Sequence, residues 1–294
     1  MVWKEWAWGG IRFLAPSNWD AGKLGPGYMM LEEESGPVME VRSGPIRGAF
    51  SPGDQLKRLG TSQDRQLRKG IREIKLPRAW QEALKPLRTL GFSWRGERVR
   101  GRGLILYCPT CGKATVLQFF EGQQRVDSRI SRAILESFRD HRRDDQVLWA
   151  VFDIRALVPS AYKLTRHRFD AGAFELVFSN RGQRITLYRW GPASVLMPKG
   201  DLLSVAERVP DLHKKDLRHI LFEGMRGLEW KEEPSRTAPG RLWQRVNVKP
   251  SLKLFRLWHM EGKNRILGVG LEGRGKPEPE EPLFDRICKD YECV

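Results

Sequence analysis

The feature that most constrains this chain of 294 residues is that its first half is repeated in its second half. The segment Ile11–Trp19 reads IRFLAPSNW and returns at Ile154–Tyr162 as IRALVPSAY, with five of nine positions identical. Three further matches follow in the same order: Arg42–Pro45 with Arg189–Pro192, Gly91–Trp94 with Gly227–Trp230, and Leu106–Cys108 with Leu257–His259. Four matches in order predict two copies of one fold.

Each copy alternates extended segments with helical ones, which predicts an α+β fold. We expect a tandem duplication of a mainly antiparallel sheet with helices packed on one face, divided into repeats 1–145 and 146–294. The predicted hairpins pair Tyr28–Leu31 with Val38–Val41, Leu104–Tyr107 with Thr115–Phe120, and Ala173–Phe178 with Arg184–Tyr188. The predicted closing helices are Ser128–Arg142 and Pro282–Tyr291.

Composition is that of an ordinary globular protein, with 40% hydrophobic and 30% charged residues. No apolar run approaches the ~20 residues that span a bilayer. The N-terminal residues lack the hydrophobic region of a signal peptide, so we expect a cytoplasmic location. The formal net charge is +16, which favours anionic partners such as nucleic acid or an acidic protein.

The two halves carry similar net charges, +9 for residues 1–146 and +7 for residues 147–294, but one stretch of the first copy is strongly basic. Between Lys57 and Arg102 there are 14 Lys/Arg and 4 Asp/Glu, a net charge of +10, whereas the matching stretch Lys199–Arg245 carries 10 and 8, a net charge of +2. Cations interleaved with glycines and an aromatic residue suit a phosphate backbone, and Trp94 offers a stacking surface. The alternatives are a solvated surface and a core role for Trp94, which its counterpart Trp230 favours.

We therefore predict a nucleic-acid-binding surface in the first copy. Four of its residues share one face of a predicted helix: Arg65, Arg68, Lys69 and Arg72. The others surround or follow the aromatic residue: Trp94, Arg95, Arg98, Arg100 and Arg102.

Cys108 and Cys111 lie in the sequence CPTCG at the tip of a predicted hairpin, which is typical of a zinc knuckle. A structural zinc site needs four ligands, and Cys288 and Cys293 are the other cysteines of the chain. The sequence thus predicts zinc held by four thiolates, with reduced unligated thiols and a disulfide or redox pair as alternatives. A strand, and not a helix, follows the pair, which disfavours redox catalysis.

The opening strand followed by Pro and an aromatic residue, carried by Phe13, Pro16 and Trp19 over about 40 residues of each copy, resembles the PsbP-like family. The resemblance implies an α/β/α or α+β fold and a role in binding or assembly. It is a resemblance of fold, and fold does not fix function.

Motifs of catalysis are missing from the sequence. There is no G-x-S-x-G, no P-loop and no dinucleotide fingerprint, and the five histidines show no metal-binding spacing. The leading expectation is a non-catalytic protein that binds nucleic acid or another polyanion and is braced by structural zinc. The alternatives are an accessory or assembly factor that docks on an acidic protein and, third, an enzyme with a site between the repeats. Oligomeric state is not predicted.

Overall fold

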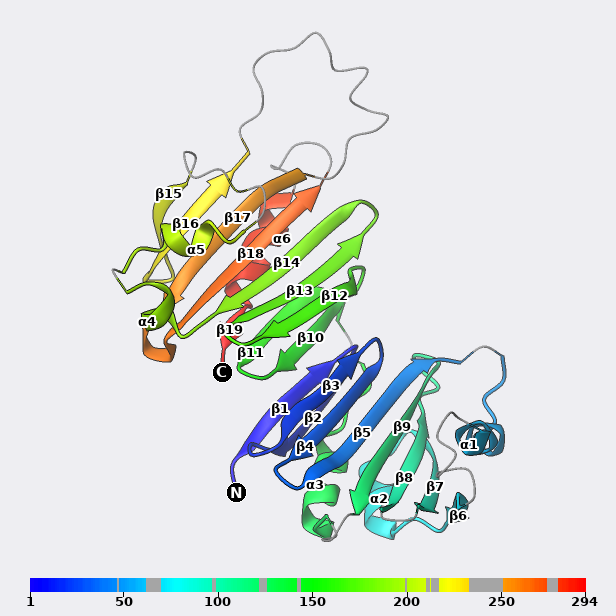
Figure 1. Ribbon diagram of the computed structural model, residues 1–294. Helices are drawn as coiled ribbons and strands as arrows, with labels where there is room; N and C mark the ends of the chain where they lie inside the picture. Colours follow the sequence, from blue (N-terminus) through cyan, green and yellow to red (C-terminus); the bar gives the residue numbers. More distant parts are fainter. Residues whose placement is uncertain are drawn as a thin grey trace. The chain divides into compact units, whose positions relative to one another are not determined.

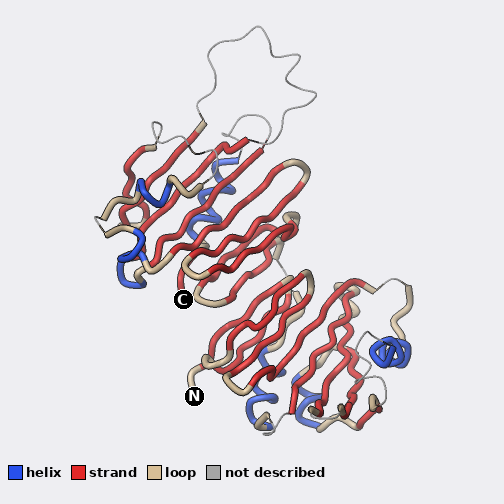
Figure 2. Tube along the Cα trace, in the orientation of Figure 1, coloured by secondary structure: helices blue, strands red, loops and turns tan. Residues whose placement is uncertain are grey.

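The computed structural model describes residues 1–46, 48–61, 70–96, 99–121, 126–141, 144–198, 200–209, 212, 217–232, 251–273 and 280–294. The chain divides into two compact units, Met1–Phe152 and Asp153–Val294. Both consist mostly of antiparallel strands with a few short helices (Figure 1, Figure 2). Within the described ranges the longest helices have ten residues, and no helix is long and apolar enough to cross a bilayer.

The first unit is built around a seven-stranded antiparallel sheet with the strand order β3-β4-β5-β9-β8-β7-β6. Its strands are β3 (Asp20–Gly25), β4 (Tyr28–Glu33), β5 (Gly36–Pro45), β6 (Arg72–Ile74), β7 (Arg88–Arg95), β8 (Arg100–Tyr107) and β9 (Lys113–Glu121). Beside it, β1 (Trp3–Trp8) pairs with β2 (Ile11–Pro16) and with β10 (Gln146–Val151). The hairpin of β1 and β2 turns at Gly9 and Gly10, which both have positive φ angles that glycine adopts without strain.

Helices cover both faces of this sheet. They are α1 (Pro52–Thr61), α2 (Arg78–Ala83) and α3 (Ser128–Ser137). α1 packs Leu56 against a core cluster that contains Trp94, whereas α2 packs Trp80 at 5.9 Å, centroid to centroid, from Phe119. In the strand register Trp94 lies opposite residue 101 and Phe119 opposite residue 102, and successive residues of a strand point to opposite faces. The predicted arrangement with helices on one face therefore does not hold in this unit.

The second unit contains another seven-stranded antiparallel sheet, with the order β12-β13-β14-β18-β17-β16-β15. Its strands are β12 (Lys163–Asp170), β13 (Ala173–Asn180), β14 (Gln183–Trp190), β15 (Arg218–Phe222), β16 (Met225–Lys231), β17 (Ser251–Met260) and β18 (Arg265–Gly273). Counted along the chain, these strands take the same places in the order as β3 to β9 do in the first sheet. The predicted hairpins in both units are confirmed.

Both faces of the second sheet are also covered. The helices are α4 (Ala193–Leu196), α5 (Leu203–Ala206) and α6 (Glu281–Lys289), with a 3₁₀ turn at Glu261–Lys263. α4 and α5 pack on a core that contains Leu257, and α6 places Phe284 near Arg256, on the other face. Finally, β19 (Glu292–Cys293) pairs with β11 (Ile154–Pro159).

The helix α3 ends earlier than the sequence predicts. Phe138 is already extended, with a ψ angle of 132°, and Arg139 forms two backbone hydrogen bonds of 2.8 Å with Arg12 of β2. This contact with a distant strand outweighs the local helical pattern of residues 138–141. It also directs Asp140 and His141 away from the helix axis.

Candidate functional site

Four of the predicted cationic residues lie together on one face of the first sheet. The register places Arg72 opposite Ser93, and Ser93 opposite Arg102. In the neighbouring row Arg95 lies opposite Arg100. Because residues that are directly opposite or two positions apart share a face, the four arginines form one cluster, which we call the arginine face (Arg72, Arg95, Arg100 and Arg102).

One carboxylate partly balances this face. Glu121 of β9, whose side chain is 10% exposed, lies 3.4 Å from Nε of Arg100 and 3.0 Å from Nε of Arg102. The Arg102 guanidinium also lies 5.2 Å from the centre of the Trp80 ring. Arg100 remains 62% exposed, so Glu121 orients it without removing it from solvent.

Trp94 lies on the opposite face, in the core. Its indole is 6% exposed and Nε1 donates a 3.0 Å hydrogen bond to Oε1 of Gln118. A Cβ atom on Gly101 would lie 2.7 Å from the Trp94 ring, so only glycine leaves room for it. This burial favours the core role of Trp94 over stacking on a base.

Arg72 does not lie on the helical face that the sequence predicts for it. Arg72 lies in strand β6, where its Nε is 3.3 Å from Oγ of Ser93, because pairing with β7 satisfies its backbone. The remaining predicted residues, Arg65, Arg68, Lys69 and Arg98, lie outside the described residues.

The two cysteines of the CPTCG sequence lie at the tip of the β8–β9 hairpin, as predicted. The backbone N–H of Cys108 donates to the carbonyl of Lys113, and that of Gly112 donates to the carbonyl of Cys108, both at 3.0 Å. Gly112 has a φ angle of +67°, a conformation that favours glycine. This tight turn directs both thiols to one side of the hairpin.

Asp140 and His141 complete a four-residue group with these thiols. One ligand atom from each of Cys108, Cys111, Asp140 and His141 lies within 4.8 Å of all the others. Cys111 Sγ donates to Asp140 Oδ2 at 3.1 Å, and His141 Nδ1 lies 2.8 Å from Asp140 Oδ1 and 3.8 Å from Cys108 Sγ. We call this group the cysteine–histidine cluster, and its donor set could hold a metal ion.

The surroundings of the cluster oppose ionisation of the Cys111 thiol and favour ionisation of the Asp140 carboxyl. Burial and the hydrogen bond to Asp140 raise the pKa of Cys111 to about 12. Burial opposes ionisation of Asp140 as well, but hydrogen bonds from the two thiols and the charge of His141 outweigh it and lower the pKa of this carboxyl. Two thiols, a carboxylate and an imidazole are ligands that zinc accepts, and a bound metal ion would displace the thiol protons.

The other two predicted ligands, Cys288 and Cys293, lie in the second unit. Cys288 is in α6 with no exposed surface, and burial raises its pKa well above the ordinary value. Cys293 is in β19, and burial raises its pKa to about 12. The sequence did not identify Asp140 and His141, because the apparent continuation of α3 concealed the turn that carries them.

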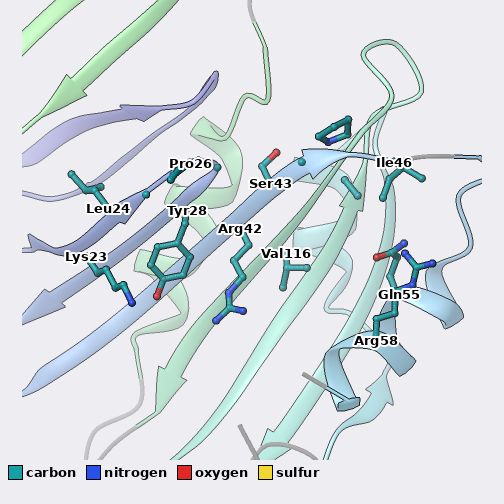
Figure 3. Close-up of a pocket in the computed structure, with 15 residues that line it drawn as sticks. Lys23, Leu24, Pro26, Tyr28, Arg42, Ser43, Ile46, Gln55, Arg58 and Val116 are labelled. Atoms are coloured by element: carbon teal, nitrogen blue, oxygen red, sulfur yellow. The ribbon is translucent and has the colours of Figure 1, made fainter. Parts of the chain in front are cut away.

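A hollow of about 700 Å³ opens on the face of the first sheet opposite the arginine face. Its polar lining comes from β3, β4, β5 and α1, and we call it the basic groove (Lys23, Tyr28, Arg42, Gln55 and Arg58). Figure 3 shows Lys23, Tyr28 and Arg42 on neighbouring strands, with the side chains from α1 across the hollow.

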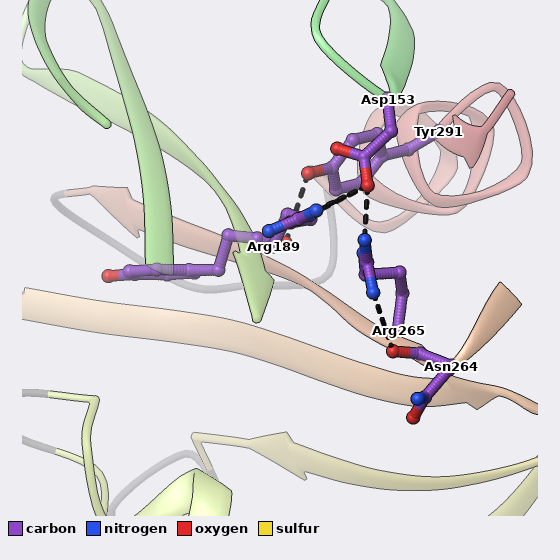
Figure 4. A network of polar contacts seen from close by, with 6 residues as sticks. Asp153, Arg189, Asn264, Arg265 and Tyr291 are labelled. Carbon is purple, nitrogen blue, oxygen red and sulfur yellow. Dashed lines mark hydrogen bonds and ion pairs between the residues drawn. The ribbon is translucent and has the colours of Figure 1, made fainter. Parts of the chain in front are cut away.

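In the second unit, Asp153 joins two strands to the C-terminal segment. Its Oδ2 accepts hydrogen bonds from Nε of Arg189 at 3.1 Å and from Nε of Arg265 at 2.8 Å (Figure 4). Burial alone would raise the pKa of Asp153, but these two arginines lower it. The Tyr291 hydroxyl donates to the carbonyl of Tyr188 at 3.0 Å. This network is structural, since each member pairs with another part of the same unit.

Comparison with known proteins assigns no family. No protein-family model matches the chain, and no curated protein matches its sequence. A crystal structure from Bacteroides thetaiotaomicron is 11% identical, with a TM-score of 0.31, over 53% of this chain and 53% of its own length. The apo structure of the immunity protein TplEi of the T6SS from Pseudomonas aeruginosa is 11% identical, with a TM-score of 0.37, over 99% of this chain and 97% of its own.

Proposed function

We propose that the protein is a non-catalytic, nucleic-acid-binding protein made of two duplicated units, of which the first binds the phosphate backbone through its arginine face. The observation that carries this proposal is the pairing of Arg95 with Arg100. Like charges directly opposite each other destabilise a strand pair, whereas a bound phosphate between them turns the repulsion into two charge-assisted contacts. The shared strand order of the two sheets supports duplication. The excess of Lys and Arg between Lys57 and Arg102 supports the proposal that the first unit is the one that binds nucleic acid.

Zinc at the cysteine–histidine cluster would brace this unit. Tetrahedral zinc with bonds of 2.0–2.3 Å holds its ligand atoms about 3.3–3.8 Å apart, so small side-chain adjustments bring the four donors to that spacing. Four protein ligands leave no coordination position for a substrate, as in structural zinc sites. The ion would join the tip of the β8–β9 hairpin to the segment after α3.

The experiment is fluorescence anisotropy of labelled single-stranded RNA and DNA at rising salt concentration. The double variant Arg95→Gln/Arg100→Gln should bind at least tenfold more weakly and show a salt dependence shallower by about 1.4 in slope, or about 0.7 for each lost phosphate contact. The matched control is Arg166→Gln/Arg184→Gln, which removes two exposed strand arginines, with cross-strand partners Glu175 and Glu272, from the second unit.

Equal affinity of the double variant and the control would contradict the arginine face as the binding surface. If the wild-type protein binds neither nucleic acid, an acidic protein partner becomes the better explanation of the charge, since electrostatic steering serves both.

A further inference from the structure

We propose that the basic groove is a second anion site, which binds the phosphate group of a small phosphorylated ligand. It lies on the opposite face of the sheet from the arginine face and goes beyond the nucleic-acid function proposed above. Its volume of about 700 Å³ falls within the range of small-molecule sites, roughly 300–1,000 Å³. Among the described residues that line it, none is Asp or Glu, whereas three are Lys or Arg.

The position of Arg42 is fixed before any ligand arrives. Its Nε and Nη2 donate to Oε1 of Glu40 at 2.8 and 2.6 Å, while the other oxygen of Glu40 accepts from Gln118. Gln118 in turn accepts from Trp94, so the network is anchored in the core. Glu40 is 4% exposed but Arg42 is 50% exposed, and the guanidinium therefore offers its further donors to the groove. Such preorganisation lowers the entropic cost of binding.

Tyr28 lies between two cations and supplies a neutral donor. The Lys23 ammonium is 5.8 Å and the Arg42 guanidinium 5.3 Å from the centre of its ring. Burial and the charge of Glu40 raise the pKa of Tyr28 to about 12, so the hydroxyl stays protonated at neutral pH. Its hydroxyl lies 3.8 Å from the thioether of Met30, a weak acceptor, and also interacts with the Glu40 carboxylate, so a phosphate oxygen would compete with Glu40 for this donor.

The remaining wall gives the ligand its second chemical feature. Apolar groups line the groove beside the cations, among them Leu24, Pro26, Ile46 and Val116. A phosphate that carries an organic group would place its charge between Lys23 and Arg42 and its apolar part against this wall. The chemical class is thus a phosphomonoester, with inorganic pyrophosphate as the other source of the same charged group.

The second unit differs at the corresponding place, where Arg166 pairs with Glu175, the residue directly opposite Tyr188. β14 occupies in its sheet the position that β5 occupies in the first, and there Tyr188 and Trp190 stack at 5.0 Å with an interplanar angle of 6°. Tyr188 also lies 6.3 Å from Phe255, and the group packs under the core that α4 and α5 cover. On the face that α4 and α5 cover, β14 thus carries stacked aromatic rings, whereas β5 carries Arg42 in the groove of the first unit.

The test is isothermal titration calorimetry of the full chain with inorganic pyrophosphate and with phenyl phosphate. We expect both to bind, and Lys23→Gln and Arg42→Gln each to weaken binding at least tenfold. Tighter binding of phenyl phosphate than of pyrophosphate identifies an organic ligand, and the reverse order an inorganic one. Arg184→Gln, which removes an exposed strand arginine of the second unit, should leave both affinities unchanged, so that the loss in the groove variants is not a general effect of removing a positive charge.

The proposal is overturned if neither probe binds the wild-type protein at millimolar concentration, or if Lys23→Gln retains full affinity. Arg42→Gln removes a partner of buried Glu40, so its thermal unfolding is measured in parallel. Should that variant unfold, Lys23→Gln and Tyr28→Phe decide the question, because neither residue is a hydrogen-bond partner of Gln118 or Trp94. If Arg95→Gln/Arg100→Gln lost nucleic-acid binding but kept its affinity for the two phosphate probes, the groove and the arginine face would be two independent sites, as both proposals require.

Discussion

Arg95 and Arg100 lie directly opposite each other across β7 and β8, and both are exposed. Glu121 is the cross-strand neighbour of Arg100 on its other side. The pair is thus a place where the fold tolerates repulsion between neighbouring arginines, which is a common property of surfaces that bind anions.

Because these two arginines repel each other, replacing one of them should stabilise the protein and weaken its binding of nucleic acid. Arg95→Gln should raise the free energy of unfolding at low salt by roughly 0.2–1 kcal/mol while it weakens binding of RNA or DNA. Urea unfolding followed by circular dichroism, at low and at high salt, measures the change. Arg184→Gln is the control, since it removes an arginine that pairs with Glu272 at 2.9 Å, and it should not stabilise the protein. A less stable Arg95→Gln protein would show that Arg95 has a favourable partner.

The cysteine–histidine cluster predicts one equivalent of zinc in untagged protein, measured by elemental analysis. Cys111→Ser, Asp140→Asn and His141→Asn should each reduce the zinc content, because each removes a donor that lies within 4.8 Å of the others. Cys288→Ala/Cys293→Ala should retain the metal. If Cys288→Ala/Cys293→Ala lost its zinc and Asp140→Asn did not, the site of four thiolates predicted from the sequence would be the correct one.

The Asp153 network predicts a specific sensitivity to acid. The pKa of Asp153 is lowered on folding, so its contribution to stability is complete above the unfolded value of 3.8 and is lost as the pH falls through the lower folded value. At pH 7, Asp153→Asn should cost about 2 kcal/mol, since it weakens charge-assisted bonds to Arg189 and Arg265. Urea unfolding at pH 7 and below pH 3.8 should show the difference between wild type and variant shrinking. A difference that is independent of pH would exclude this linkage.

Because Gly101 packs closely against Trp94, adding one methyl group at position 101 should strongly destabilise the protein. In Gly101→Ala the new Cβ would lie 2.7 Å from the indole and 2.8 Å from the carbonyl oxygen of Phe119, which should cost about 1–3 kcal/mol. Gly44→Ala is the control, because no atom lies within 4 Å of a Cβ built there. Thermal unfolding followed by tryptophan fluorescence compares the two variants, and equal midpoints would contradict the packing described for Trp94.

Local patterns in the sequence were sufficient to predict the hairpins. Alternation in Arg184–Tyr188 and the turn sequence between Cys108 and Gly112 are encoded within a few residues, and both predictions are confirmed. The end of α3 was not predictable in this way. Arg139 leaves the helical path because its backbone pairs with Arg12, a contact across more than one hundred residues.

The same limit applies to the comparison of the two halves. Gly91 and Gly227 match in sequence, and their strand partners are Leu104 and Trp258. The sequence match instead set Tyr107 against Trp258, three positions away. Hydrogen bonding between neighbouring strands decides which residues of the two units correspond, and comparison of the two halves of the sequence does not detect it. The roles of Glu40 and Gln118 were missed for the same reason, because they meet only when β5 and β9 are side by side.

The central strands of the first unit serve two surfaces by strict alternation. In β9, Gln118 supports the groove through Glu40, whereas Glu121 balances the arginines on the reverse side. A substitution at one position therefore leaves its neighbour's surface chemically intact. Selection could remodel either specificity without a compromise in the other, while insertion of a single amino acid within these strands would exchange the two sides at once.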